Sequence, residues 1–224
     1  RGKARERQGR VGEAESDLRA AVAALGLAGA PAARDLITAL EMLAETLVAS
    51  RKDTEGEATE RRAVELARRE LGADHPLLGK ALTSWSRALR VLGRLPEAEA
   101  AAREALALDE RVLGEDHPQT LRALRVLAEL LRERGNLDAA LPLVQQELAG
   151  QLRTVGEHHP DAARAMEFLA ILESAQGRNS AAEVWYGRAL DVYRASLGER
   201  HPTTIRALRN QNEFWRRRGD DAQA

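Results

Sequence analysis

The sequence predicts an all-α fold of the α-solenoid type, built from two-helix repeats of 42 residues. Three observations predict it: a six-residue motif recurs at a constant interval, a glycine recurs at the same interval, and the composition favours helices over strands. A constant period of roughly 20–50 residues is typical of repeat arrays, in which each unit packs only on its neighbours.

The two markers define the repeats. The motif has the form Leu/Val-Gly-x-x-His-Pro and occurs at 71–76, 113–118, 155–160 and 197–202. The glycine occurs at Gly93, Gly135, Gly177 and Gly219. This register predicts a single array over residues 1–224, divided into a partial repeat at 1–26 that is mainly a second helix, full repeats at 34–71, 76–113, 118–155 and 160–197, and a partial repeat at 202–224 that supplies a first helix.

The composition is that of a helical protein. Apolar residues make up 44% of the chain but aromatic residues only 3%, and alanine, leucine and arginine dominate. These three are strong helix formers, and the β-branched runs that strands favour are absent. No run of about 18 apolar residues occurs, so we expect no membrane span.

Charge and cysteine content narrow the class of protein. The chain has 34 lysines and arginines against 35 acidic residues, which argues against a generally basic nucleic-acid binder. It has no cysteine, which excludes disulfides and thiolate metal sites and favours a cytoplasmic location. The N-terminus lacks the apolar core of a signal peptide and does not begin with Met, which indicates a segment of a longer protein.

Each repeat is predicted to contain two helices, which we call helix A and helix B. In the third repeat helix A is expected over 119–134, with leucines at helical spacing, and helix B over 138–154. Small residues mark the place where the two helices of a repeat cross and their axes approach closely. In helices A they are Ala44, Ser86, Ala128 and Ala170, and in helices B they are Gly56, Ala98, Ala140 and Ala182.

The His-Pro pairs are interpreted as structural linkers. Successive pairs lie one repeat apart, so no two of these histidines can share a metal ion at a ligand distance of about 2 Å. We therefore expect no metal and no cofactor. Asp74 and Asp116 are expected to cap the helices A that follow them. No nucleophile elbow, phosphate loop or zinc motif occurs, so the chain is not predicted to be an enzyme.

Two residues of the third repeat predict local weaknesses. Gly150 stands where other helices B carry Leu66, Leu108 and Val192, so it is expected to remove a core side chain and to cost helix propensity. Pro142 is expected to delay the start of its helix or to bend it mildly.

The aromatic residues are assigned from their register. Trp85 takes a leucine position, and Tyr186 follows the apolar register of Val144, so both are expected in the core, together with Trp185. Trp215 lies in the last helix A, and its register leaves its burial open.

The linker Leu113-Gly114-Glu115-Asp116-His117-Pro118, together with Leu124, Leu127-Ala128, Gly135 and Ala140, resembles tetratricopeptide repeats of the 42-residue kinesin light chain type. The resemblance covers nearly the whole chain and implies a right-handed superhelix. In that family, helix A lines a concave face on which a peptide lies. The usage of arginine and alanine resembles bacterial repeats that are often fused to kinase, NTPase or protease domains.

The resemblance implies a binding stripe on the helices A. In the first repeat it consists of Thr38, Glu41 and Glu45. The predicted peptide-binding residues of the later repeats are Lys80, Arg87, Arg90, Arg122, Arg125, Glu129, Arg132, Arg164, Glu167, Arg206, Arg209 and Asn210. Basic side chains outnumber acidic ones from the second repeat onward, and arginine suits carboxylates and phosphates, so an acidic ligand segment is preferred. The asparagines with which the family holds a peptide backbone are replaced at Met42, Ser84, Val126 and Phe168, and only Asn210 keeps the amide.

The leading hypothesis is therefore a non-enzymatic module that binds a protein or peptide segment. Two alternatives stay open: a regulatory part of a larger signalling enzyme whose ligand is a neighbouring domain, and a scaffold that self-assembles through its terminal helices. Nucleic-acid binding ranks last, because the charge is balanced and the stripe carries both signs.

Overall fold

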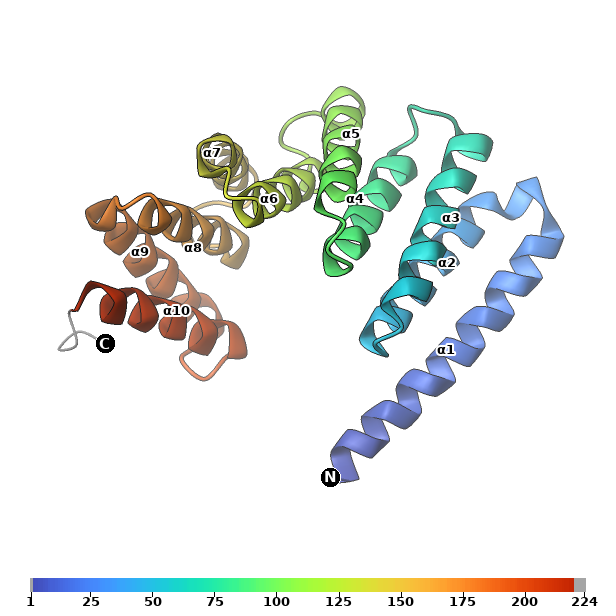
Figure 1. Cartoon of the computed structure of the whole chain (residues 1–224), viewed down its shortest axis with the longest axis horizontal. Coiled ribbons are helices and arrows are strands. Elements are labelled where there is room, and N and C mark those ends of the chain that lie inside the picture. Colours follow the sequence, from blue (N-terminus) through green and yellow to red (C-terminus); the bar gives the residue numbers. More distant parts are fainter. Residues whose placement is uncertain (1, 220–224) are drawn as a thin grey trace. The chain divides into compact units, whose positions relative to one another are not determined.

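The computed structural model describes residues 2–219, with side chains from residue 10 onward, and these residues form helices connected by short turns (Figure 1). The helices are α1 (Gly2–Ala28), the short 3-10 helix η1 (Ala30–Ala32), α2 (Ala33–Ala49), α3 (Asp53–Leu71), α4 (Pro76–Val91), α5 (Leu95–Leu113), α6 (Pro118–Glu133), α7 (Leu137–Thr154), α8 (Pro160–Ala175), α9 (Asn179–Leu197) and α10 (Pro202–Arg218). They divide into two compact units, the first ending at Gly114 and the second beginning at Glu115. The all-α solenoid prediction is confirmed.

In the first unit, α1 packs on α2, and two helical hairpins, α2–α3 and α4–α5, pack on each other through α3 and α4. The core is made of the leucines of helices A and the alanines of helices B. Ile37 and Leu47 on α2 and Ala63 and Ala67 on α3 are fully buried. Burial of these apolar stripes stabilises helices that would be marginal in isolation.

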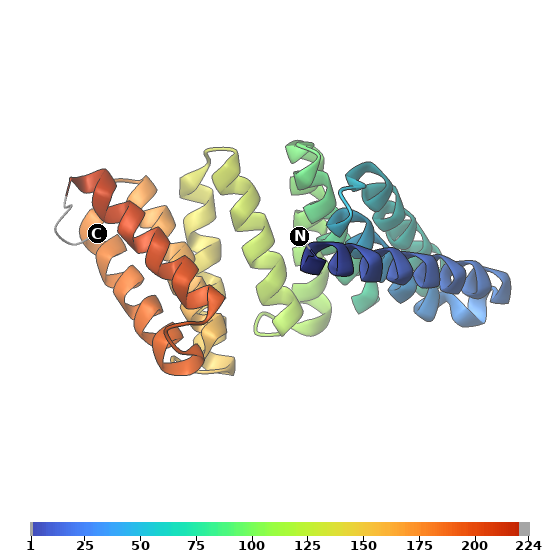
Figure 2. The ribbon, with the colours of Figure 1, turned by 90° about the horizontal axis from the view of Figure 1, so that it is seen from below.

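In the second unit, the hairpins α6–α7 and α8–α9 pack on each other through α7 and α8, and α10 packs on α9 (Figure 2). Leu124 and Leu130 on α6 and Val144 on α7 are fully buried. Near the end of this unit the core becomes aromatic, because Tyr186 on α9 packs with Phe214 and Trp215 on α10.

The small residues predicted at the crossing of each hairpin lie in the core. In the second repeat, the Ser86 hydroxyl on α4 donates a hydrogen bond of 2.8 Å to the carbonyl oxygen of Ala98 on α5. In the first repeat, a Cβ built on Gly56 lies 3.3 Å from the carbonyl oxygen of Ala44. Only small side chains permit such a close approach of two helix backbones.

The helix bounds of the third repeat agree with the expected ones to about one residue, since α6 covers Pro118–Glu133 and α7 covers Leu137–Thr154. Of the two effects expected from Pro142, the delayed start is wrong, because α7 begins at Leu137 and the Ala140 N–H donates to the Asn136 carbonyl oxygen at 3.2 Å. The Asn136 side chain also accepts from the Ala139 N–H at 3.3 Å. This cap holds the first turn, so the one donor that proline lacks does not delay the helix. The mild bend stays a prediction.

The first helix is longer than its register predicts. The partial repeat at 1–26 was expected to be mainly a helix B, but α1 runs unbroken from Gly2 to Ala28, so a single helix fills it. A single glycine costs a helix only about 1 kcal/mol and does not end it. Gly9 and Gly12 therefore lie within α1.

The helices A from the second repeat onward begin at a His-Pro pair, and in each pair the histidine is the N-cap. The Nδ1 atoms of His75, His117 and His159 each accept a hydrogen bond of 3.1 Å from the backbone N–H two residues further on, and that of His201 accepts one of 3.2 Å. These pairs are therefore structural linkers, as expected, because each imidazole accepts a hydrogen bond from a backbone N–H that has no partner within the first turn of the helix.

The capping role expected of Asp74 and Asp116 is wrong. Each aspartate lies one residue outside the capping position and pairs instead with an arginine of helix B: Asp74 with Arg111 on α5, and Asp116 with Arg153 on α7 at 2.9 Å. These pairs are exposed, so they contribute little to stability.

The aromatic expectations are met to different degrees. Tyr186 is buried, and the open question of Trp215 is settled by its burial, at 7% exposure, in the aromatic cluster of the second unit. Trp185 is half-buried against that cluster. Trp85 is only half-buried, and its indole N–H donates to Oε1 of the buried Glu57 at 2.8 Å.

One turn departs from the glycine rule of the repeats. The turns between helices A and B need a residue with positive φ, and Gly93, Gly135 and Gly177 supply it, but the first repeat has Arg51 with φ 64°. A non-glycine residue in this region costs roughly 1–2 kcal/mol, part of which a glycine returns through the greater freedom of the unfolded chain.

We therefore expect Arg51→Gly to raise the free energy of unfolding by about 0.5–1 kcal/mol, measured by urea denaturation. The neighbouring Ser50 has φ −87° and provides a matched control, since Ser50→Gly should lower stability. An equal effect of the two substitutions would contradict the strain at Arg51.

Candidate functional site

The predicted stripe of the first unit lies on α2 and α4. Lys80 on α4 reaches across to α2, where its Nζ atom lies 2.8 Å from Oε2 of Glu41. Arg87 is exposed and Arg90 is half-buried on the same face of α4. The carboxylate of Glu41 is buried, so this contact joins two helices A through a partly desolvated ion pair.

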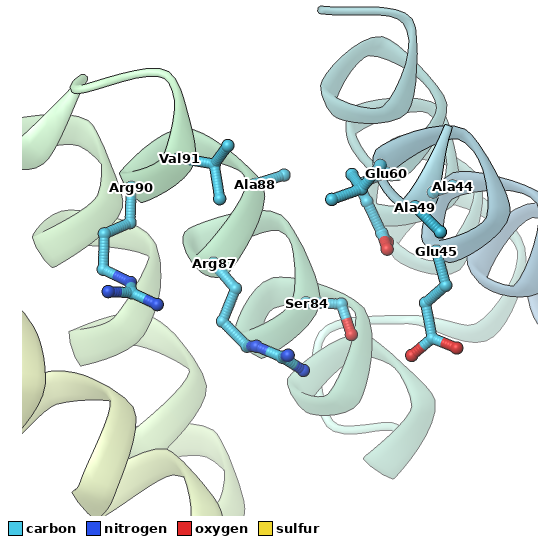
Figure 3. A pocket seen from close by; sticks show the side chains of 10 residues that line it. Ala44, Glu45, Ala49, Glu60, Ser84, Arg87, Ala88, Arg90 and Val91 are labelled. Atoms are coloured by element: carbon cyan, nitrogen blue, oxygen red, sulfur yellow. The ribbon is translucent and has the colours of Figure 1, made fainter. Parts of the chain in front are cut away.

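A cavity of about 360 Å³ opens beside this stripe, between α2, α3 and α4 (Figure 3). Its lining is mostly aliphatic, with Ala44, Val48, Ala49, Ala88 and Val91. The polar lining residues are Glu45 on α2, Glu60 on α3, and Ser84, Arg87 and Arg90 on α4. In Figure 3 the two carboxyl groups stand on one wall of the cavity and the two arginines on the other.

Glu60 is the unusual member of this lining. Its side chain is only 3% exposed, and its Oε2 atom has no hydrogen-bond partner. Burial raises the pKa of this carboxyl to about 8, and the nearby carboxylates of Glu41 and Glu45 act in the same direction, while Arg87 and Lys80 oppose it. A buried carboxyl without a full set of partners favours its neutral form.

The second unit has its own buried carboxylate, Glu147 on α7. Its Oε1 atom accepts a hydrogen bond of 3.0 Å from Arg125 on α6, which is itself largely buried. Burial raises the pKa of Glu147 to about 7 against the opposing charges of Arg125 and Arg164. Arg125 therefore serves an internal ion pair more than an exposed binding face.

Glu167 on α8 is the centre of a polar network at the other end of this unit. Its carboxylate accepts hydrogen bonds from Arg206 at 3.0 Å, from Asn210 at 2.7 Å and from the Tyr193 hydroxyl at 3.3 Å. The structure thus brings three of the predicted binding residues together, but as partners of one another. The side-chain amide of Asn210 donates its hydrogen bond to Glu167, although this amide was expected to hold a peptide backbone.

The other predicted residues of the second unit are more accessible. Arg122, Arg132 and Arg209 are exposed, Glu129 is half-buried, and Arg164 pairs with Asp161 at 2.8 Å. Of the four positions where asparagine is replaced, Val126 and Phe168 are buried and Met42 is exposed. A peptide on this unit would therefore meet mainly arginine side chains.

Comparison with known proteins decides the family. Models of the tetratricopeptide repeat match residues 36–77, 85–153 and 127–195. The chain belongs to the tetratricopeptide repeat family. No curated protein sequence matches it. The repeats of such folds generally serve as non-enzymatic interaction scaffolds.

Kinesin light chain-like proteins are among the solved structures whose fold is similar to that of these tetratricopeptide repeats. The crystal structure of BtubC (BKLC) from P. vanneervenii has a TM-score of 0.82 at 18% identity, over 96% of this chain and 86% of that one. A putative kinesin light chain with nearly identical repeats from Podosopora anserina has a TM-score of 0.70 at 21% identity, over 87% and 92%. The apo form of RapI has a TM-score of 0.63 at 11% identity, over 94% and 60%. At these identities the likeness concerns the fold.

Glu60 and Glu147 were missed among the site residues, although the repeat register carries a signal for both. Glu60 corresponds to Ala102, Val144 and Tyr186 in the other tetratricopeptide repeats, and Glu147 corresponds to Ala63, Ala105 and Ala189. A charged residue at a position that is otherwise apolar is expected to be buried at a cost, which makes it a candidate for function.

Neither a metal-binding cluster nor a membrane-spanning helix occurs in the part of the chain that the structure describes. No cluster of three or more histidine, aspartate or glutamate side chains is arranged to hold a metal ion among residues 10–219. None of the helices of the described tetratricopeptide repeats is long and apolar enough to cross a membrane.

Proposed function

We propose that this tetratricopeptide array is a non-enzymatic protein–protein interaction module that binds a peptide or protein segment on the faces of its helices A. The observation that carries the proposal is the exposed arginine set on the helices A of the second unit, Arg122, Arg132 and Arg209, which a folded array needs neither for its core nor for its turns. Long charged side chains that no core requires are available to a partner.

The charge of these side chains favours an acidic segment as the ligand. An arginine fork donates two parallel hydrogen bonds to a carboxylate or phosphate, which gives both direction and energy to the contact. Arg125, Arg164 and Glu167 are excluded from the primary contact set, because each has a partner within the unit.

The test is a peptide-display selection on the 224-residue chain, repeated with Arg122, Arg132 and Arg209 changed to Glu. We expect acidic peptides to be enriched by the wild type and lost in the variant, because three attractive charges become repulsive. The matched control changes Arg153, Arg188 and Arg194 to Glu. These arginines are equally exposed but belong to helices B, and the control should keep the enrichment.

Two results would contradict the proposal. Equal loss in both triple variants would mean that net charge, and not the helix-A face, selects the peptides. No enrichment from folded protein would exclude short peptides and leave a neighbouring folded domain or a second copy of the chain as the partner. Light scattering against concentration distinguishes these two, because only self-assembly raises the mass of the isolated chain.

A further inference from the structure

We infer that the cavity between α2, α3 and α4 receives a basic side chain, a lysine or an arginine, of the bound partner. The inference rests on the proposed function, since it assigns one contact of the same interaction. It follows from the shape of the cavity, from the unsatisfied carboxyl at its base and from the absence of an equivalent carboxyl in the other repeats.

The cavity has the form that a long basic side chain requires. Its walls are aliphatic, with Ala44, Val48 and Ala88 among the lining residues, and they suit the methylene stem that lysine and arginine share. The carboxyl group of Glu60 lies deep between the helices, and that of Glu45 lies on the same side (Figure 3). A stem in the aliphatic part therefore places its cationic head against carboxylate oxygens.

The carboxyl of Glu60 lacks what such a head supplies. Its side chain is more than nine-tenths buried, it lines the cavity, and its Oε2 atom accepts no hydrogen bond. Leaving a buried acceptor unpaired is costly, and an ammonium or guanidinium N–H restores the missing bond in its charge-assisted, stronger form.

An anionic head group fits the cavity less well. It would meet Glu45 and Glu60 directly, and Glu41 lies near enough to act on the charge of Glu60. Arg87, which is exposed, stands on the opposite wall, where it suits the carboxylate of a neighbouring ligand residue. The preferred segment thus carries a basic residue next to an acidic one.

The cavity also fixes the register of the partner. The positions equivalent to Glu60 are Ala102, Val144 and Tyr186, none of which carries a carboxyl group. Of the four full repeats, the first alone can therefore hold the basic side chain in this way. A segment that slid by one repeat would lose this contact.

The test uses n-butylguanidinium, which copies the end of an arginine side chain, and n-butylurea, its neutral counterpart of the same shape. Chemical shifts of the 224-residue chain are followed by NMR during titration at pH 8.5. We expect butylguanidinium to shift residues around the cavity and to bind at least about tenfold more tightly than butylurea, in line with a charge-assisted hydrogen bond.

Two variants make the test specific. Glu60→Gln keeps the shape of the side chain and should lower the affinity for butylguanidinium about tenfold, while Glu147→Gln changes an equally buried carboxyl in the other unit and should leave it unchanged. In the wild type, the affinity should fall about tenfold between pH 8.5 and pH 6, because protonation of Glu60, in its setting of Glu41, Glu45, Lys80 and Arg87, removes the acceptor charge. Glu60→Gln should abolish this dependence.

Butylurea binding as tightly as butylguanidinium, or an affinity unaffected by Glu60→Gln, would overturn the inference. Either result is independent of the peptide selection. If acidic peptides were still enriched through the arginines of the helices A, the chain would remain an interaction module, and only the basic side chain would be dropped from the proposed ligand. Selected peptides that bind wild type and Glu60→Gln alike would also count against the cavity.

Discussion

Replacing Gly150 with leucine, the residue that two other helices B carry at this position, should lower the free energy of unfolding by about 2 kcal/mol. From the register alone the opposite is expected, because leucine restores a core side chain and improves the helix propensity by about 1 kcal/mol. The structure shows why this gain is lost. A Cβ built on Gly150 lies 2.4 Å from Cδ2 of Leu121, so the space is already occupied.

The pair Leu121 and Gly150 is an inverted copy of a pair in the previous repeat. Each repeat places a helix-A residue and a helix-B residue at these two positions. In the first repeat both are large, Ile37 and Leu66, whereas the pairs of the next three repeats are Gly79 with Leu108, Leu121 with Gly150, and Ala163 with Val192. In each of these three pairs one residue is small where the other is large, and all six residues are buried. In the second, third and fourth repeats the space is therefore shared by one large side chain, which either helix can supply.

A double-mutant cycle tests this reading by urea denaturation. Leu121→Gly alone should cost about 4 kcal/mol, since it opens a cavity and weakens α6. The double variant Leu121→Gly with Gly150→Leu gives the third repeat the pair of the second and should recover about half of the summed losses. A coupling energy of about 3 kcal/mol is expected, whereas additive losses would show that the two sites do not share one space.

The positions of the helices could be predicted because they depend on short local motifs that recur in successive repeats. The His-Pro pairs and the turn glycines set the ends of the helices, and the small residues Ser86 and Ala98 set the crossing of a hairpin. The capping role wrongly expected of Asp74 and Asp116 concerned the same local motif. Histidine caps a helix less often than aspartate, and only the backbone geometry shows which of two adjacent side chains reaches the open N–H.

The candidate site was less predictable, because it depends on which side chains already have partners. The stripe of helix A was placed by its register, but Arg125 turned out to serve Glu147, and Arg206 and Asn210 turned out to serve Glu167. Spacing along one helix does not reveal a partner on another helix. The cavity at Glu60 depends on three helices at once, so no single stretch of sequence predicts it.

The free energy of unfolding should fall as the pH rises from about 4.5 to about 8, and Glu60 should account for a large part of the fall. Its carboxyl has an ordinary pKa in the unfolded chain and a pKa of about 8 in the folded one. The folded state therefore holds a proton that the unfolded state releases over this range. Stability is fully present below the unfolded pKa and is lost as the pH approaches the folded pKa.

The expected loss is on the order of 4–5 kcal/mol, because the pKa rises from 4.5 to about 8 and each unit of pKa difference corresponds to about 1.4 kcal/mol. Glu60→Gln removes the titration but keeps the size and polarity of the side chain. The variant should match the wild type near pH 4.5 and exceed it increasingly toward pH 8. The measurement is urea denaturation of both proteins, followed by circular dichroism, at intervals across this range.

A constant difference between the two proteins at every pH would show that Glu60 titrates normally in the folded chain. Glu147→Gln provides the contrast, because Glu147 has a pKa of about 7 and an arginine partner at 3.0 Å. At pH 4.5 this carboxyl is also protonated in the folded chain, so Glu147→Gln should lie close to the wild type there. Toward pH 7 the variant should exceed the wild type, but by less than Glu60→Gln, because Arg125 and Arg164 oppose the rise in the pKa of Glu147. The two buried carboxyls thus differ in how much stability their burial costs. Both cost stability at neutral pH, Glu147 less than Glu60 because Arg125 pairs with it, and a basic ligand side chain in the cavity would offset the cost at Glu60.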